Sequence, residues 1–287
     1  MSYQPPQGQP KTEKHLGQLV ARYAEAEGLA LRRVRLRISA MAFVGALTRV
    51  REEDSPERFL IKGGMACELR FQEKARATRD LDAIFHGSLD QLLADLDAAF
   101  AEPYSSFSFT YTEPEEIRDT GSHRLEIRLQ YQGRSWGTLR VEVSPPEGQA
   151  ELESDHVPAL SIAEFGLTGP EFVACLSLRY QIAQKLHACS EHFDDRENER
   201  AHDLIDLLLM EELIDDYGRV RQACLDTFSL RGTRDWPPTL DIEPNWRDVY
   251  PALAAELKFP LADVDEAVAA VQALIQRIDA AELPPDE

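Results

Sequence analysis

The chain has few cysteines, fewer bases than acids and no long apolar run, and each shortage excludes a class of protein. Its four cysteines form no C-x-x-C pair and its seven histidines show no zinc spacing, so we expect reduced core thiols rather than disulfides or a zinc site. No apolar run approaches the length of a membrane span, and the polar start has no secretory signal. We therefore expect a cytoplasmic protein with no membrane partner.

The charge balance argues against a nonspecific nucleic-acid binder. There are 31 lysines and arginines against 51 acids, a net charge of −20, which repels phosphate backbones overall. Residues 28–51 run against this trend, because they contain six arginines and no acid. This segment is either a solvated helix face or a docking site for a polyanion. Its arginines are Arg32, Arg33, Arg35, Arg37, Arg49 and Arg51.

The hydrophobic pattern predicts an α+β first half and a mainly helical second half, a bilobed protein. Periods of three to four residues predict helices, and alternation predicts strands in a mixed or antiparallel sheet. The predicted helices span residues 15–27, 31–50, 89–100, 171–193, 200–215, 219–230 and 261–281, and the predicted strands include 106–112, 124–131 and 135–144. The predicted divisions are a disordered leader (1–12), an α+β domain (13–160), a helical domain completing the active-site cleft (161–282) and a tail (283–287).

A short strand, a glycine pair and two spaced acids follow one another between residues 59 and 82. Residues 59–61 predict a strand, and the apolar neighbours of Asp80 and Asp82 predict that both acids lie on the next strand, facing the same way. Two such carboxylates repel each other unless a cation such as Mg²⁺ or Mn²⁺ lies between them. Gly63 and Gly64 allow the backbone to approach a triphosphate. Each motif alone is usually a turn or a solvated strand end, but their order suggests nucleotidyl or phosphoryl transfer.

A second group of charged residues lies in the helical half. Lys185 is at the edge of an apolar stripe, where it either extends its ammonium to water or faces a cleft. Asp203 and Asp206 lie on a helix that is apolar on most sides, so their carboxylates should have partners. The group is either a structural ion-pair network or part of an active site.

Both groups resemble the signatures of the AbiEii/AbiGii nucleotidyltransferase toxins of type IV toxin–antitoxin systems. The first signature, a glycine pair followed by Arg-x-(Ser/Thr)-x-Asp-(Leu/Ile/Phe)-Asp, matches Gly63 and Gly64 with residues 76–82. The second matches residues 184–188 and 200–207. The similarity is closest to the mycobacterial MenT branch, extends over about residues 63–278 and is weakest in the first fifty residues.

The resemblance implies a nucleotidyltransferase-like fold and an active site that includes Lys185 and either Asp203 or Asp206. It also implies addition of ribonucleotides, pyrimidines in some members, to the 3′ acceptor end of tRNA, which blocks translation. A cognate antitoxin is then a partner, and we expect a monomer. The four arginines Arg32, Arg33, Arg35 and Arg37 would contact the phosphates of the tRNA acceptor stem.

With an NTP as substrate, the expected roles follow from the chemistry of each side chain. Asp80 and Asp82 would hold Mg²⁺, with Glu142 reaching them from an adjacent antiparallel strand as a third ligand. The glycines would cradle the phosphates, and the cations Lys62, Arg76 and Lys185 would meet the departing pyrophosphate. The hydroxyl of Thr78 would touch a phosphate or be a target for inactivating modification. The alternatives are transfer onto a protein or small molecule, and a non-catalytic nucleotide-binding regulatory module.

Overall fold

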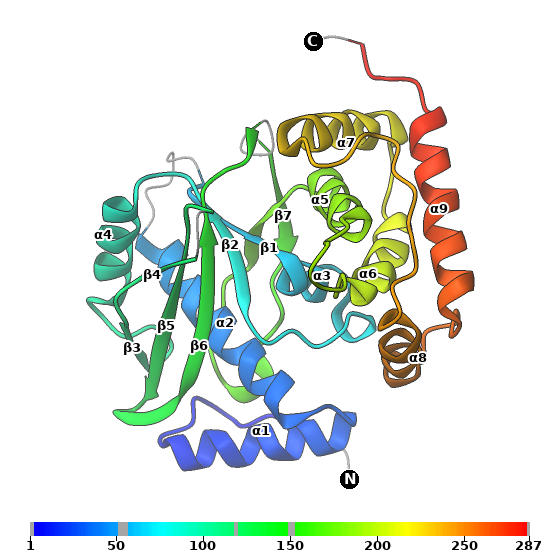
Figure 1. Ribbon diagram of the computed structural model, residues 1–287. Coiled ribbons are helices and arrows are strands. Elements are labelled where there is room, and N and C mark those ends of the chain that lie inside the picture. The colour runs from blue at the N-terminus through cyan, green and yellow to red at the C-terminus, as the bar shows by residue number, and fades with distance from the viewer. Residues whose placement is uncertain (1–2, 51–56, 118–119, 149–152, 286–287) are drawn as a thin grey trace. The chain divides into compact units, whose positions relative to one another are not determined.

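The computed structural model describes residues 3–50, 57–117, 120–148 and 153–285, and the chain divides into two compact units (Figure 1). The first unit comprises Met1–Arg70, Ala77–Pro145 and His156–Cys175. The second comprises Phe71–Arg76, Pro146–Asp155 and Leu176–Glu287. The chain therefore passes between the units several times, and the short Phe71–Arg76 segment belongs with the helical unit.

A mixed sheet forms the centre of the first unit. Its strand order among the described residues is β3–β5–β6–β2–β1–β8–β7, and β4 pairs with β5. The β1–β2 and β5–β6 pairs are antiparallel, whereas β2–β6 and β1–β8 are parallel, which confirms the predicted α+β class with a mixed sheet. The strands are β1 (Phe59–Lys62), β2 (Leu81–Phe85), β3 (Phe107–Tyr111), β4 (Glu115–Ile117), β5 (Ser122–Tyr131), β6 (Arg134–Ser144), β7 (Ser154–Pro158) and β8 (Phe172–Leu176).

Helices cover one face of this sheet, and alternation along the strands explains which one. Leu125, Ile127 and Leu129 of β5 are buried, whereas Arg124 and Arg128, which alternate with them, are exposed. The buried residues join one core with α1 (Glu13–Glu27), α2 (Leu31–Val50) and α4 (Leu89–Phe100), and α2 crosses this face in Figure 1. The other face of β5 and β6 therefore carries polar side chains.

The sheet register places polar side chains from successive strands in one row. Glu115 of β4 pairs with Arg124 of β5, and Arg124 pairs with Glu142 of β6. Asp82 of β2 is the register partner of Glu142 on one side and of Lys62 on the other. Because register partners project to the same face, these charges are neighbours on the face opposite α2.

The second unit is mainly helical, in agreement with the sequence prediction. Leu186, Leu207, Trp246 and Leu274, from four different helices, are all fully buried. Its helices are α5 (Leu178–Ser190), α6 (Ala201–Glu211), α7 (Tyr217–Arg231), α8 (Trp246–Leu257) and α9 (Val264–Ala280). None of the helices in the described ranges is long and apolar enough to cross a membrane.

The prediction of one helix over residues 171–193 was wrong. Phe172–Leu176 is strand β8, paired in parallel with β1, and α5 begins only at Leu178. The run Phe-Val-Ala-Cys-Leu fits a buried strand as well as a helix, so periodicity alone does not separate the two. Cys175 accordingly lies on a strand, and the helical part of the chain begins after it.

Helix α8 was absent from the prediction, which took Pro237, Pro238 and Pro244 as irregular links between helices. Pro244 precedes the helix, and Pro251 lies inside it at the sixth position. Pro251 lies beyond the first turn, so the helix forms although this residue cannot donate an intrahelical hydrogen bond. The two apolar residues Trp246 and Tyr250, one turn apart, are both fully buried.

The segment for which a disordered leader was predicted packs against the first unit where it is described, over residues 3–12. The Tyr3 hydroxyl donates to the backbone carbonyl of Glu164 at 2.8 Å, and its ring meets that of Tyr23 edge-on, with centroids 5.1 Å apart. The buried Tyr131 hydroxyl donates to the carbonyl of Pro10 at 2.6 Å. Proline and glutamine dominate the composition, but these tyrosine contacts order the backbone.

Candidate active site

The junction of β1 and α3 (Gly63–Phe71) brings glycine backbone against the first acid pair. The chain passes from Lys62 directly into α3, and Gly63 has a positive φ of 63°. A Cβ on Gly63 would overlap the carboxylate of Asp82. The sequence predicted a glycine turn before a helix, whereas here both glycines form the start of the helix, whose free N–H groups favour anions.

The acids Asp80 and Asp82 are brought together with cations on the same sheet face. Asp82 lies within β2, while Asp80 immediately precedes it. Arg140 of β6 approaches the Asp80 carboxylate, with Nη1 3.6 Å from Oδ1. Lys62, opposite Asp82, donates from Nζ to Ser144 Oγ at 2.6 Å. The cations reduce the repulsion that two neighbouring carboxylates would otherwise suffer.

Glu142 lies beside Asp82, but not in the way that the sequence predicted. The pairing of β2 with β6 is parallel rather than antiparallel, and it places Glu142 directly opposite Asp82. Arg124 holds the Glu142 carboxylate, donating from Nε at 2.9 Å and from Nη2 at 2.6 Å to Oε1. Glu142 therefore already has a cationic partner.

The hydroxyl of Thr78 forms a hydrogen bond with the nearby backbone. It donates from Oγ1 to the backbone carbonyl of Asp80 at 3.0 Å, and the side chain is half-buried. This bond fixes the turn that leads into β2, a typical use of a threonine next to an aspartate.

The carboxylates of the first unit suit a divalent ion that keeps part of its water shell. Within the described ranges, no three His, Cys, Asp or Glu side chains are grouped closely enough to hold a metal. Mg²⁺, however, usually binds through one or two carboxylates and completes its shell with water and substrate phosphates. Asp80 and Asp82, next to a helix start, fit that requirement, while Glu142 is occupied by Arg124.

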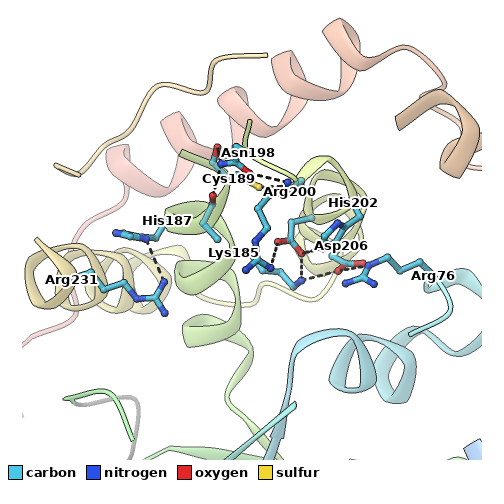
Figure 2. A network of polar contacts seen from close by, with 11 residues as sticks. Arg76, Lys185, His187, Cys189, Asn198, Arg200, His202, Asp206 and Arg231 are labelled. Atoms are coloured by element: carbon cyan, nitrogen blue, oxygen red, sulfur yellow. Dashed lines mark hydrogen bonds and ion pairs between the residues drawn. The ribbon is translucent and has the colours of Figure 1, made fainter. Parts of the chain in front are cut away.

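The second unit brings together the charged residues of the second signature (Figure 2). Arg76, which belongs to the first sequence signature, joins them there. Lys185 on α5 is only 7% exposed, and its ammonium donates to Asp203 Oδ1 and, at 2.7 Å, to Asp206 Oδ2. Arg76 reaches the same Asp206 oxygen from Nε at 3.3 Å. Lysine thus contacts both candidate aspartates, and the first signature contributes a cation to the cluster of the second.

Lys185, Asp203, Asp206, Arg76, Arg200 and His202 form one charged group, called the Lys185 cluster below. Burial and charge set the pKa values in it. Burial raises the pKa of Asp203, but Lys185, with His202 and Arg200, more than offsets this and holds that pKa below its usual range. Burial lowers the pKa of His202 to about 4, opposed by the neighbouring Asp203. At neutral pH the cluster therefore contains an ionised Asp203 and an uncharged His202.

One oxygen of Asp206 has no hydrogen-bond partner among the described residues. Oδ2 is shared by Lys185 and Arg76, but Oδ1 is buried and unsatisfied. A buried carboxylate oxygen without a partner costs free energy, so it marks either a bound water or a ligand contact. The sequence predicted partners for Asp206, and the structure supplies them for only one of its oxygens.

Sequence reasoning missed Asn198, which joins the two helices of the cluster. This residue is 1% exposed, and its amide nitrogen donates to the carbonyls of Ala188 and Glu191, both at 2.8 Å. Its Oδ1 accepts from the Arg200 N–H at 2.9 Å. The end of α5 is thereby fixed to the start of α6, which carries Asp203. The sequence offered one clue to this role, the position of Asn198 two residues before Arg200 of the second signature.

His187 belongs to a separate polar group on the other side of α5 (Figure 2). Arg231 Nη1 lies 3.3 Å from its Nδ1, and Thr233 Oγ1 lies 3.0 Å from its Nε2. Because arginine can only donate, Nδ1 accepts and the ring proton is on Nε2. Burial, reinforced by Arg231, lowers the pKa of His187, so the ring is neutral and orients its neighbours.

The arginine-rich segment lies mostly in helix α2, and most of its guanidinium groups are used inside the first unit. Arg33 Nε donates to the buried Glu68 at 2.8 Å, Arg35 lies over the Trp136 ring with its Cζ 3.9 Å from the centroid, and Arg37 is 3.9 Å from Glu164. Arg32 is exposed, and Arg51 lies outside the described residues. Arg33, Arg35 and Arg37 therefore have internal partners, and RNA contact by the four arginines stays a prediction.

A cavity of about 800 Å³ in the first unit lies apart from these motifs. Its lining includes Leu47, Arg58, Tyr104 and Phe172 and contains none of the predicted site residues. The predicted site residues of the first unit therefore lie outside this cavity.

Comparisons with known proteins agree with the class that this site defines, the nucleotidyltransferases. The AbiEii family model, described as a nucleotidyl transferase AbiEii toxin of a type IV toxin–antitoxin system, matches residues 45–276. The chain belongs to this family and is a toxin-type nucleotidyltransferase. None of the curated proteins compared with the chain matches it.

Three solved structures resemble the chain to different degrees. MenT4, a nucleotidyltransferase toxin from Mycobacterium tuberculosis H37Rv, is 17% identical with a TM-score of 0.61, covering 93% of this chain and 90% of its own. An antigenic nucleotidyltransferase-like protein from Paracoccidioides brasiliensis is 15% identical over 78% of this chain and 91% of its own, with a TM-score of 0.38. ANT(2")-Ia in complex with adenylyl-2"-tobramycin is 17% identical over 68% of this chain and 97% of its own, with a TM-score of 0.36. Only the MenT4 likeness is close enough to support the fold.

Proposed function

We propose that the protein uses an NTP and Mg²⁺ (or Mn²⁺) to add ribonucleotides, pyrimidines among them, to the 3′ acceptor end of tRNA and thereby blocks translation. The observation that carries this proposal is the contact between Gly63 and the Asp82 carboxylate. The start of a helix, which favours anions, therefore lies next to a carboxylate that could bind a metal ion. A nucleoside triphosphate requires both.

In this proposal the first unit binds the triphosphate. The N–H groups at the start of α3 and the Lys62 ammonium face the phosphates, and Asp80 and Asp82 hold the ion. The ion supplies positive charge to the phosphate oxygens and lowers the pKa of the attacking hydroxyl. Arg140 would exchange its contact with Asp80 for a phosphate or a water when the ion binds, because its guanidinium is exposed.

The charged cluster of the second unit holds two cations, Lys185 and Arg76, next to Asp206. The Arg76 side chain is 20% exposed and shares the Asp206 carboxylate with Lys185. Lys185, Asp203 and Asp206 carry one positive and two negative charges, and Arg76 balances them. Lys185 therefore acts chiefly by holding both aspartates and orienting Arg76, and the unsatisfied Asp206 Oδ1 accepts from a water or from the substrate.

The family implies an antitoxin partner, and transfer assays decide the acceptor. The protein is incubated with each α-labelled NTP, Mg²⁺ and total tRNA, and the label is followed into three fractions. Label in tRNA at the 3′ end supports the proposal. Label in protein or small molecules identifies a different acceptor, and label in no fraction favours a non-catalytic nucleotide-binding module.

A further inference from the structure

The ammonium group of Lys62 is held by a side chain that lies two strands away. Lys62 is the last residue of β1, and its Nζ donates to Oγ of Ser144, the last residue of β6, at 2.6 Å. Strand β2 lies between β1 and β6 in the sheet. Because neighbouring strands are about 4.8 Å apart, the lysine side chain crosses β2 on the face that carries Asp82, the register partner of Lys62.

The bond to Ser144 also determines on which side of Asp82 the ammonium lies. Ser144 is the register partner of Ile84, two positions after Asp82 on β2, whereas Asp80 lies two positions before Asp82. The ammonium is therefore on the side of Asp82 that faces away from Asp80. The proposed function puts the divalent ion between these two carboxylates, and the bond to Ser144 keeps the lysine charge out of that position.

The Ser144 hydroxyl is itself held in the orientation that this bond requires. Its Oγ donates to the backbone carbonyl of Ala83 at 3.3 Å, so the hydroxyl proton is used and a lone pair faces the ammonium. Ser144 is half-buried, and Ala83 directly follows Asp82 on β2. The strand that carries the acid therefore also orients the serine.

Lysine needs such a partner more than other cations do, because its ammonium is a point charge on a long, flexible stem. Without the bond to Ser144, the ammonium would move toward the neighbouring carboxylates of Asp80 and Asp82 and compete there with a divalent ion. With the bond, the side chain is ordered before a triphosphate binds, so less conformational entropy is lost on binding. Loss of the hydroxyl should therefore weaken binding of both the ion and the nucleotide.

We propose that Ser144 is a positioning residue that acts through Lys62. It keeps the ammonium out of the position of the divalent ion and directs it to the triphosphate at the start of α3. That helix start is adjacent, because Gly63, its first residue, directly follows Lys62. This inference rests on the proposed function, and Ser144 itself touches neither the ion nor the nucleotide.

The test is a double-mutant cycle on ligand binding by the full chain. Ser144→Ala removes the hydroxyl, Lys62→Met removes the charge but keeps an unbranched side chain, and the double variant removes both. Ser144→Thr keeps the hydroxyl, and Ser135→Ala, at an exposed site of the same strand, is the matched control. Dissociation constants are measured for Mn²⁺ alone and for each NTP with Mg²⁺, and urea unfolding verifies the fold of every variant.

We expect Ser144→Ala to raise both dissociation constants on the order of ten-fold, as for the loss of one hydrogen bond to a charged group. Lys62→Met should bind the NTPs more weakly but Mn²⁺ at least as tightly as the wild type, because one repelling charge is gone. In the Lys62→Met background, Ser144→Ala should change neither constant, since no ammonium remains to be positioned. Ser144→Thr and Ser135→Ala should both bind as the wild type does.

Two results would overturn the inference while leaving the proposed function in place. One is a Ser144→Ala protein that binds Mn²⁺ and the NTPs with the wild-type constants. The other is an equal loss from Ser144→Ala with and without Lys62→Met, which would mean that the serine does not act through the lysine. If the wild-type protein binds neither Mn²⁺ nor any NTP, the proposed function itself fails, and this inference fails with it.

Discussion

At Gly63 the backbone conformation and the neighbouring carboxylate both exclude a side chain. We predict that Gly63→Ala nearly abolishes nucleotide transfer, because the new Cβ must displace Asp82, and that it costs at least about 1 kcal/mol of stability for a positive φ. Gly133→Ala is the control, since Gly133 has a φ of 72° and open space around it. Transfer rate and urea unfolding are measured for both. Equal rates for the two variants would show that displacement of Asp82 does not matter.

Lys185 now has a predicted structural role as well as a catalytic one. Removing its ammonium leaves Asp203 and Asp206 buried with less compensation, so we expect Lys185→Ala to lower the free energy of unfolding by about 3–5 kcal/mol. We also expect the rate per folded molecule to fall. Lys14→Ala, at an exposed site, should change neither quantity. A Lys185→Ala protein that melts as the wild type does would contradict the burial argument.

Because burial lowers the pKa of His202, we predict that the free energy of unfolding falls as the solution becomes acidic. The folded state keeps this ring neutral down to about pH 4, whereas an unfolded histidine binds a proton near pH 6.5. Protons therefore favour the unfolded chain between these values, and stability should fall by on the order of 2–3 kcal/mol as the pH is lowered from 6.5 to 4. His202→Gln should flatten this part of the urea-unfolding profile, while His15→Gln, at an exposed position, should leave it unchanged. An unaltered profile in His202→Gln would exclude the effect.

At the scale of elements, the Arg33–Glu68 ion pair ties α2 to α3. Glu68 is 4% exposed, and burial raises its pKa against the opposing effect of Arg33. We predict that Arg33→Ala costs about 3 kcal/mol, because it leaves a carboxylate buried and unpaired. Arg32→Ala, one position away but exposed, should lie within about 0.5 kcal/mol of the wild type. Denaturant unfolding of the two variants tests this, and a stable Arg33→Ala would favour the prediction that Arg33 contacts RNA.

The elements that could be predicted are those with a clear local pattern. Residues 31–50 and 89–100 have an uninterrupted helical pattern, and both helices have these bounds in the structure. The β5–β6 hairpin was equally visible from alternation around Gly133. Strand β8 was missed because a five-residue apolar run fits either structure, and helix α8 because the prolines around it were taken as breaks between helices.

The candidate residues of the site could be chosen from the sequence, but the pairings among them could not. Asp80, Asp82, Lys185 and the two helical aspartates could be selected from spacing and from the family resemblance. The parallel pairing that places Glu142 beside Asp82, and the contact of Arg76 with Asp206, depend on residues about 60 and 130 positions apart. No local pattern records such contacts, so they required the fold.

At the scale of the whole molecule, a ligand that binds only the folded state must raise its stability. We predict that NTP with Mg²⁺ increases the melting temperature, with a stabilisation of about 2.7 kcal/mol at a ligand concentration 100 times Kd. Removal of Mg²⁺ by chelation should abolish most of the shift, because two carboxylates repel the triphosphate without the ion. Asp80→Asn should melt as the wild type does without ligand, since Asp80 is partly exposed.

The same variant separates metal binding from folding. If Asp80 holds the ion, Asp80→Asn loses both the Mg²⁺-dependent shift and nucleotide transfer, while the shift produced by NTP alone is at least as large as in the wild type, because one repelling charge is gone. Arg22→Ala, with an exposed charge on α1, should retain the full response. A normal Mg²⁺-dependent shift in Asp80→Asn would place the ion elsewhere in the chain, because the amide keeps the shape of the carboxylate but supplies no charge.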